Sequence, residues 1–220
     1  MSLWIKICGN TSLEDALLAV DAGANAVGFV FAPSPRRVTV EQVAAIVPHL
    51  PASVEKIGVF VDASLDEIVA AVEACGLTGV QLHFAAAPEM PAQLRAQLGA
   101  EVRILRVVHF GAEAAEQAAA VAQDPHVDAV LVDSRTALAE GGTGVAFDWQ
   151  VARTTLFQNG EERKFIAAGG LTPANVADAI VTLRPWGVDA VSGVEAAPGR
   201  KEPLKVQLFI ARARVAGAAI

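Results

Sequence analysis

Short apolar runs rich in Val, Ile and Phe alternate along the chain with segments that have the Ala/Leu/Glu pattern of amphipathic helices. The runs start about 25 residues apart, which is the length of one strand–helix unit. The predicted strands are Trp4–Cys8, Ala26–Phe31, Glu55–Val61, Gly79–His83, Arg103–Phe110, Ala129–Ser134, Lys164–Gly169 and Val188–Ser192. Eight such units predict an α/β fold, a closed (β/α)8 TIM barrel rather than an open sheet, with residues 1–220 as a single barrel domain.

Capping signals mark where helices begin and end. Ser12, Thr39 and Ser64 each stand three residues before Asp, Gln or Glu, which is capping-box spacing or a near variant of it. Thr172 followed by Pro173 predicts a further helix start. Glycines that should stop helices are Gly23, Gly76 and Gly99.

The stretch from Lys164 to Glu195 predicts an anion site. Gly169, Gly170 and Gly193 end two adjacent strands, and the predicted helix between them adds the partial positive charge of an N-terminus. The loops after strands 7 and 8 are the usual phosphate site of a TIM barrel. Any one of these glycines is explained by a tight turn, but the set favours phosphate.

Composition narrows the classes of protein. The chain is 53% hydrophobic with a formal charge of −7, which argues against a nucleic-acid binder or an anionic membrane surface as partner. Two cysteines give no disulfide framework, and no apolar run is long enough to span a membrane. No long apolar signal segment opens the chain, so a soluble cytoplasmic protein is expected.

Active sites of such barrels lie at the C-terminal ends of the strands. Cys8, His83 and Asp133 end predicted strands, and Arg36 lies in a proline-stiffened loop. A buried cysteine is usually a small hydrophobe, and His83 fits a core position about as well as a site. Asp133 is harder to explain structurally, because an unpaired buried carboxylate is costly. Considered alone, Arg36 is most simply explained as a solvated charge in a surface loop.

Strand alternation places Lys6 on the same side as Cys8. If that side is the barrel interior, the Lys6 cation should lower the pKa of the Cys8 thiol. Gln81 and Asp133 have the right parity to be partners of Lys6. The Gly141–Gly144 loop is either an ordinary loop or a lid. The dispersed histidines argue against a metal site, and the lack of a Gly-x-Gly-x-x-Gly motif argues against a dinucleotide cofactor. No cofactor is therefore expected.

Motifs along nearly the whole chain resemble those of the phosphoribosylanthranilate isomerase family of tryptophan biosynthesis. The matching stretches are Lys6–Gly9, Gly28–Phe31, Ser34–Arg36, Val80–His83, Val132–Asp133, Gly141–Gly144, Phe147–Trp149, Ala168–Leu171, Asn175–Val176, Ser192–Glu195 and Gly199–Lys201. The resemblance implies a TIM barrel that isomerises N-(5-phosphoribosyl)anthranilate to 1-(2-carboxyphenylamino)-1-deoxyribulose 5-phosphate, an Amadori rearrangement without cofactor.

The resemblance also implies the site residues. Cys8 is similar to the family's general base and Asp133 to its general acid, while Arg36 matches the arginine that meets the anthranilate carboxylate. The remaining expected contacts to this small phosphoribosyl substrate are His83, Gly142, Gly169, Gly170, Ser192 and Gly193. A monomer or a homodimer is expected.

The chain departs from the family pattern at two places. Ala190–Val191 stands where one more hydroxyl is expected before Ser192, and Phe84 stands where glycine is expected. Two alternatives remain at this stage: another phosphate-binding barrel enzyme, and a non-catalytic barrel that only binds a phosphosugar, which the fold by itself does not exclude. The motif Lys6–Gly9 in the first strand together with Asp133 in the sixth argues against another barrel enzyme, and the joint presence of Cys8, Asp133 and Arg36 argues against a non-catalytic barrel.

Overall fold

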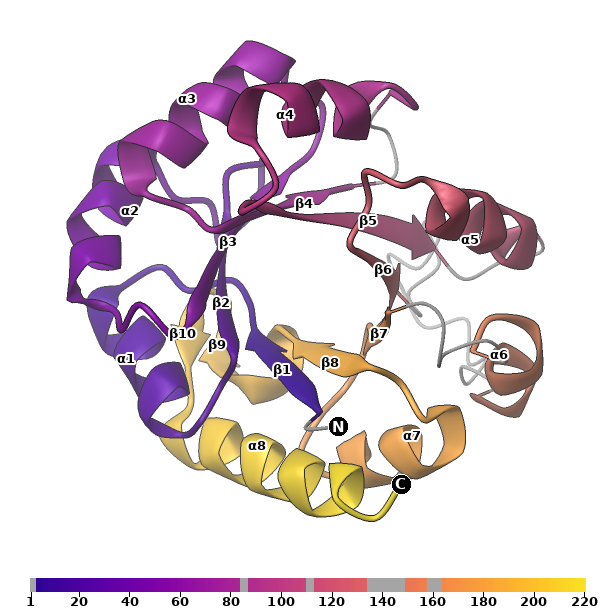
Figure 1. Ribbon diagram of the computed structural model, residues 1–220. Helices are drawn as coiled ribbons and strands as arrows, with labels where there is room; N and C mark the ends of the chain where they lie inside the picture. The colour runs from indigo at the N-terminus through magenta and orange to yellow at the C-terminus, as the bar shows by residue number, and fades with distance from the viewer. Residues whose placement is uncertain (1–2, 84–86, 110–112, 134–148, 158–163) are drawn as a thin grey trace.

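The predicted barrel is confirmed. The computed structural model describes residues 3–83, 87–109, 113–133, 149–157 and 164–220. Eight parallel strands close in sequence order, with β8 pairing back onto β1, and helices surround them (Figure 1). The barrel strands are β1 (Trp4–Ile7), β2 (Ala26–Val30), β3 (Glu55–Phe60), β4 (Gly79–Leu82), β5 (Arg103–His109), β6 (Ala129–Asp133), β7 (Phe165–Ala168) and β8 (Gly187–Ala190).

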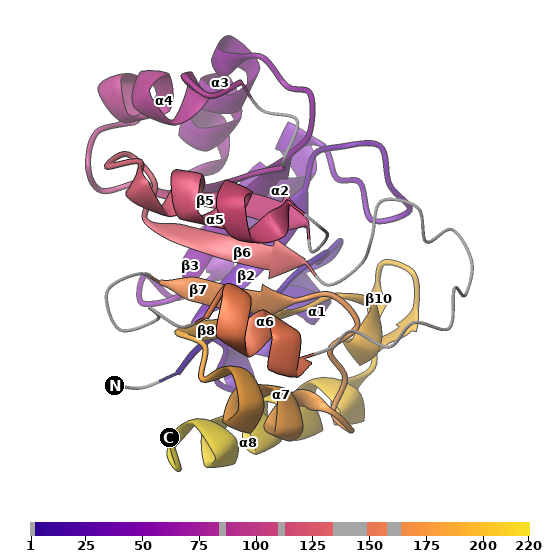
Figure 2. The same cartoon turned by 90° about the vertical axis from the view of Figure 1, so that its right-hand side faces the viewer.

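The outer layer consists of helices that follow the strands. They are α1 (Leu13–Asp21), α2 (Val40–Ile46), α3 (Leu65–Cys75), α4 (Met90–Leu98), α5 (Ala114–Gln123), α6 (Trp149–Thr155), α7 (Val176–Leu183) and α8 (Pro203–Gly217). Short 3₁₀ turns, η1 (Val47–His49) and η2 (Ser192–Val194), and a small antiparallel hairpin, β9 (Glu195–Ala197) with β10 (Arg200–Lys201), complete the described elements. The hairpin lies at the opposite end of the barrel from the two termini (Figure 2).

The helix starts follow their capping signals. The side chains of Thr39 and Ser64 form complete capping boxes with Gln42 and Glu67, and Ser12 accepts from the backbone N–H of Asp15. Gly76 and Gly99 stand at the C-caps of α3 and α4 with positive φ, as predicted; Gly23, also at positive φ, follows the C-cap of α1.

The strands bury both faces, as expected for a parallel barrel. One set of side chains packs outward against the helices, and a second cluster fills the interior. The interior cluster consists of Trp4, Ala26, Ile57, Leu105, Val107, Ala129, Leu131, Ile166 and Ala168. Above this apolar plug, towards the C-terminal ends of the strands, the interior becomes polar, with Lys6, Gln81, Asp133 and Asp189 all buried.

Candidate active site at the C-terminal ends of the strands

A cleft at the C-terminal end of the barrel joins Asp133 to the turns after β7 and β8. Asp133 is the last residue of β6 and is buried. The lining residues are Asp133, Ala168, Gly169, Gly170, Leu171, Asp189, Val191, Ser192 and Gly193. The structure therefore brings together Asp133 and the residues predicted to bind phosphate at the ends of β7 and β8.

The glycines of this cleft have different physical roles. Gly169 and Gly170 have φ values of 81° and 64°, which side chains rarely adopt. Gly193 is required by space, because a Cβ there would lie 1.9 Å from the carbonyl oxygen of Leu171. The turns after β7 and β8 thus touch through their backbones. Ser192 lies in η2 rather than in a strand, which corrects the predicted strand end.

The helix predicted to start at Thr172 begins later. α7 starts at Val176, and residues 173–175 form a turn. In that turn the Asn175 Oδ1 accepts from the Thr172 N–H at 2.7 Å, and the Asn175 Nδ2 donates to the Gly170 carbonyl at 3.1 Å. Thr172 Oγ1 still accepts from the N–H of Ala174. Asn175 therefore pins the glycine turn, a role that sequence reasoning did not assign to it.

Cys8 follows β1 and is buried at 3% exposure. A Cβ added at Gly28 of β2 would lie 2.4 Å from Cys8 Sγ and 3.0 Å from Lys6 Cε, so both side chains occupy the space that Gly28 leaves. Asn10 ties the strand ends together by donating to the carbonyls of Ile7 and Gly28. The same-side placement predicted for Lys6 and Cys8 is confirmed.

Lys6 is fully buried in the barrel interior. Its ammonium donates to Gln81 Oε1 and to Asp189 Oδ1, both at 2.8 Å. The prediction of Gln81 as a partner is confirmed. Asp189 is the residue that sequence reasoning missed, although its parity in β8 and its direct pairing with Lys6 carried the signal.

The groups around Lys6 and Cys8 shift the pKa of the Cys8 thiol in the opposite direction to the one predicted. Burial raises the pKa of the Cys8 thiol above its ordinary value, and this outweighs the ammonium of Lys6, which lowers it; Asp189 raises it further. Burial by itself would lower the pKa of Lys6, but Asp189 and Cys8 raise it. The prediction of a thiol with a lowered pKa is wrong for this structure, in which Cys8 favours the neutral form.

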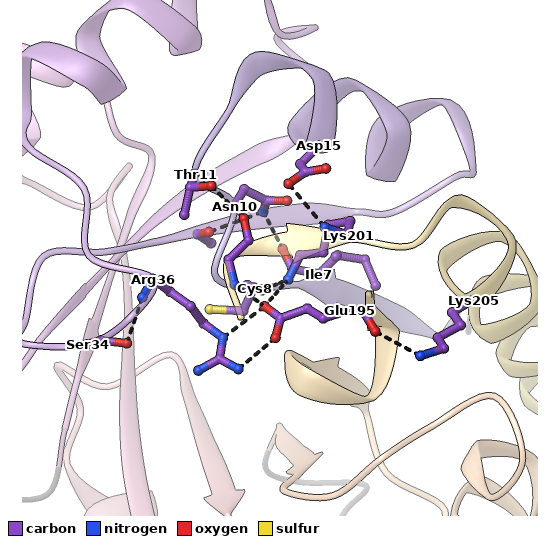
Figure 3. Close-up of polar contacts among 12 residues, drawn as sticks. Ile7, Cys8, Asn10, Thr11, Asp15, Ser34, Arg36, Glu195, Lys201 and Lys205 are labelled. Carbon is purple, nitrogen blue, oxygen red and sulfur yellow. Dashed lines mark hydrogen bonds and ion pairs between the residues drawn. The ribbon is translucent and has the colours of Figure 1, made fainter. Parts of the chain in front are cut away.

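Arg36 reaches the site from the loop after β2 (Figure 3). Its Nε and Nη2 donate to the two carboxylate oxygens of Glu195 at 2.8 and 2.6 Å. The Arg36 side chain passes over Gly9, because a Cβ at Gly9 would lie 2.8 Å from Arg36 Cδ. Arg36 is thus an ion-paired residue beside Cys8 rather than a solvated loop charge. Glu195 and Lys201 were matched only as motif positions, and no role was predicted for them.

His83 lies half-buried directly after β4, where its ring is 4.8 Å from that of His109 at the end of β5, centroid to centroid. Sequence reasoning missed His109, which also ends a strand. Gly142, the rest of the Gly141–Gly144 loop and Phe84 lie outside the described residues.

Within the described residues, no three or more His, Cys, Asp or Glu side chains are arranged to hold a metal ion. No helix there combines the length and apolarity needed to cross a membrane.

The model of the N-(5′-phosphoribosyl)anthranilate (PRA) isomerase family matches residues 5–212. The N-(5′-phosphoribosyl)anthranilate isomerase of Pelobacter propionicus is 44% identical over 207 residues, which cover 94% of this chain and 93% of the relative. That of Magnetococcus marinus is 44% identical over 215 residues, covering 97% and 96%.

Solved structures agree. The phosphoribosyl anthranilate isomerase of Thermotoga maritima superposes with a TM-score of 0.85 at 33% identity, covering 97% of this chain and 99% of that one. A phosphoribosyl anthranilate isomerase in complex with reduced 1-(o-carboxyphenylamino)-1-deoxyribulose 5-phosphate gives a TM-score of 0.82, with the same identity and coverage. The chain therefore belongs to the N-(5′-phosphoribosyl)anthranilate isomerase family and is an isomerase.

Proposed function

We propose that this isomerase converts N-(5-phosphoribosyl)anthranilate to 1-(2-carboxyphenylamino)-1-deoxyribulose 5-phosphate in tryptophan biosynthesis, with Cys8 as general base and Asp133 as general acid. The observation that carries the proposal is the cleft in which Asp133 faces the glycine turns after β7 and β8. It offers a proton donor beside backbone amides that suit a phosphate. The related enzyme with bound reduced product supports the same class of ligand.

The proposed reaction is an Amadori rearrangement. Asp133 donates a proton to the ribose ring oxygen as the C1′–O bond breaks, which leaves an iminium at C1′. The Cys8 thiolate then removes the C2′ proton, which the iminium has acidified, and an enolamine forms. C1′ gains a proton and the C2′ hydroxyl loses one to give the ketone. One proton returns from Cys8 to Asp133 before the next turnover.

The surroundings of Cys8 constrain this step. Its thiol is held in the neutral form by burial, so it must lose a proton before it acts as a base. Lys6 below it and Lys201 beside it are the cations that lower the pKa of the thiol, and they stabilise the thiolate once it forms. In this proposal the free enzyme carries mostly thiol, and the base is generated as the pH rises or as the substrate binds.

In this proposal the phosphate and the anthranilate carboxylate of the substrate bind to different groups of residues. The phosphate binds at Gly169, Gly170, Ser192 and Gly193, and the anthranilate carboxylate meets Arg36. Because Ala190 and Val191 supply no hydroxyl before Ser192, the phosphate depends chiefly on backbone N–H groups. His83 and Gly142 are the remaining proposed contacts.

Consumption of the fluorescent substrate tests the proposal directly. Cys8→Ala and Asp133→Asn should each lower kcat by about 100-fold or more, the range that general acid–base groups contribute, while the fold remains intact. Cys75→Ala is the matched control, because Cys75 is the other buried cysteine and lies in α3, away from the strand ends.

Each unexpected result has a distinct meaning. A nearly normal kcat for Cys8→Ala would rule out Cys8 as the general base, and a nearly normal kcat for Asp133→Asn would rule out Asp133 as the general acid. Binding of the substrate by the wild-type protein without turnover would instead favour a barrel that only binds a phosphosugar.

A further inference from the structure

Glu195, the first residue of β9, is a buried carboxylate with donors on several sides. Its side chain is 4% exposed and accepts from Arg36 Nε and Nη2, from Lys201 Nζ at 3.2 Å and from the Gly199 N–H at 3.3 Å. Burial alone would raise the pKa of Glu195, but the hydrogen bonds from Arg36 and Lys201 hold it below its usual value. Glu195 is therefore an anion shared between two cations (Figure 3).

Lys201, on β10, connects this carboxylate to the end of β1. Its buried ammonium donates to the backbone carbonyl of Cys8 at 2.6 Å as well as to Glu195. The Lys201 N–H donates to Asp15 Oδ2, and Lys205 Nζ donates to the Glu195 carbonyl at 2.8 Å. The hairpin is thus fixed to α1, to α8 and to the strand end that carries Cys8.

The bonds to Glu195 determine which edge of Arg36 remains available. A guanidinium has five N–H donors, and Glu195 takes the one on Nε and one of the two on Nη2. None of the described residues accepts a hydrogen bond from Nη1. The Arg36 side chain is 18% exposed, so the edge formed by Nη1 and Nη2 can receive a second carboxylate in the paired geometry that arginine favours.

The charges are consistent with this use. Arg36 and Lys201 carry two positive charges against the single negative charge of Glu195. A substrate carboxylate on the free edge of Arg36 would neutralise the remaining charge at a largely buried position, where an ion pair is screened little.

We infer that Glu195 and Lys201 are positioning residues of the isomerase. The Glu195 carboxylate aims the Nη1/Nη2 edge of Arg36 at the anthranilate carboxylate of the substrate. Lys201 in turn fixes the Glu195 carboxylate relative to the backbone of Cys8. The inference rests on the proposed role of Arg36. It assigns Glu195 to substrate recognition through Arg36 and not to the proton transfers.

A double-mutant cycle tests it. Glu195→Gln, Arg36→Met and the double variant are compared for kcat and KM. Glu195→Gln should raise KM about tenfold, the effect of losing one charge-assisted hydrogen bond, while kcat changes less. The double variant should have the KM of Arg36→Met alone, because Glu195 has nothing left to aim.

Two controls separate positioning from folding. Glu202→Gln removes a nearby carboxylate that caps α8 by accepting from the N–H groups of Leu204 and Lys205; it should lower the Tm and leave KM unchanged. The inhibition constant of inorganic phosphate, which reports the other end of the substrate, should stay the same in Glu195→Gln. If Glu195→Gln does not fold, Glu195→Asp replaces it, since the shorter side chain keeps the charge but draws back from the guanidinium.

The outcomes are distinct. An unchanged KM in a folded Glu195 variant overturns the inference, as do effects of Glu195→Gln and Arg36→Met that multiply in the double variant. An unchanged KM in Arg36→Met would refute the proposed role of Arg36 itself, while the assignments of Cys8 and Asp133 would stand.

Discussion

Two opposite charges act on Cys8 from the layer below it. Lys6 lowers the pKa of the thiol and Asp189, bonded to Lys6 at 2.8 Å, raises it, so the carboxylate offsets part of the benefit of the cation. A partner for Lys6 is nevertheless necessary, because a buried and unpaired ammonium is very costly. Asp189 therefore stabilises the fold and makes the Cys8 thiol harder to ionise.

This balance predicts the pH dependence. The groups that act on Cys8 are Lys6, Asp189 and, from the hairpin, Lys201. Because the pKa of the thiol is raised, kcat/KM of the wild type should still rise with pH above about 8.5, the ordinary pKa of cysteine. Asp189→Asn removes a group that raises this pKa, so the rising limb of the kcat/KM–pH profile should move to lower pH.

The wild type and Asp189→Asn are compared by the pH at which kcat/KM rises, because this pH does not depend on the maximal rate. Asp128→Asn serves as the control, because Asp128 pairs with Arg95 before β6, away from Cys8. A limb that stayed in place or moved to higher pH in Asp189→Asn would contradict the assignment of Cys8 as the titrating base.

At the scale of elements, the proposed phosphate end of the site depends on the contact between the turns after β7 and β8. Gly193 in η2 packs against the carbonyl of Leu171, and Asn175 holds the glycine turn from the α7 side. The cleft thus arises where two strand ends approach more closely than side chains would permit.

Gly193→Ala should disrupt this contact. The added Cβ would meet a backbone atom at 1.9 Å, and a backbone atom cannot rotate away as a side chain can. We expect the two turns to separate, with KM and the inhibition constant of inorganic phosphate both rising about tenfold, which corresponds to about 1.4 kcal/mol.

Gly99→Ala is the control for this variant. Gly99 has a φ of 75° and open space around it, so alanine there should cost about 1–3 kcal/mol of stability through backbone strain and leave phosphate inhibition unchanged. Normal phosphate inhibition in a folded Gly193→Ala would show that the phosphate does not depend on this contact.

At the scale of the whole molecule, the two ends of the barrel serve different purposes. The N-terminal ends of the strands are covered by Trp4 and Trp186, whose rings stack at 5.2 Å. Glu55 joins this cover by accepting from Trp4 Nε1 at 3.1 Å and from Arg103 Nε at 2.6 Å. These contacts join β1, β3 and β5 far from the proposed catalytic groups.

Glu55→Ala should therefore affect stability alone. The Arg103 and Glu55 side chains are about a quarter exposed, so we expect a loss of about 1 kcal/mol. For a chain of this length, that loss lowers the Tm by roughly 2–4 °C. Thermal unfolding and steady-state kinetics on one preparation are the measurement, and an altered KM would show that the two ends are coupled.

Local patterns in the sequence were sufficient to predict the eight strands and several helix starts. Alternating patterns placed all eight strands, and capping boxes at Thr39 and Ser64 marked helix starts, because these signals act within a few residues of the chain. Parity was sufficient to place Lys6 beside Cys8 and Gln81. The resemblance supplied the roles of Cys8, Asp133 and Arg36, which remain predictions.

The partners of the buried charged groups, and the balance of charge around Cys8, follow from the closed barrel. Lys6 pairs with Asp189 across 183 residues of sequence, and Arg36 pairs with Glu195 across 159, so both contacts depend on how the barrel brings distant strand ends together. α7 begins at Val176, after the predicted start, although the Val176 N–H still donates to the Thr172 carbonyl at 3.1 Å. The pKa of Cys8 rose because burial, which depends on the whole barrel, outweighs one neighbouring cation.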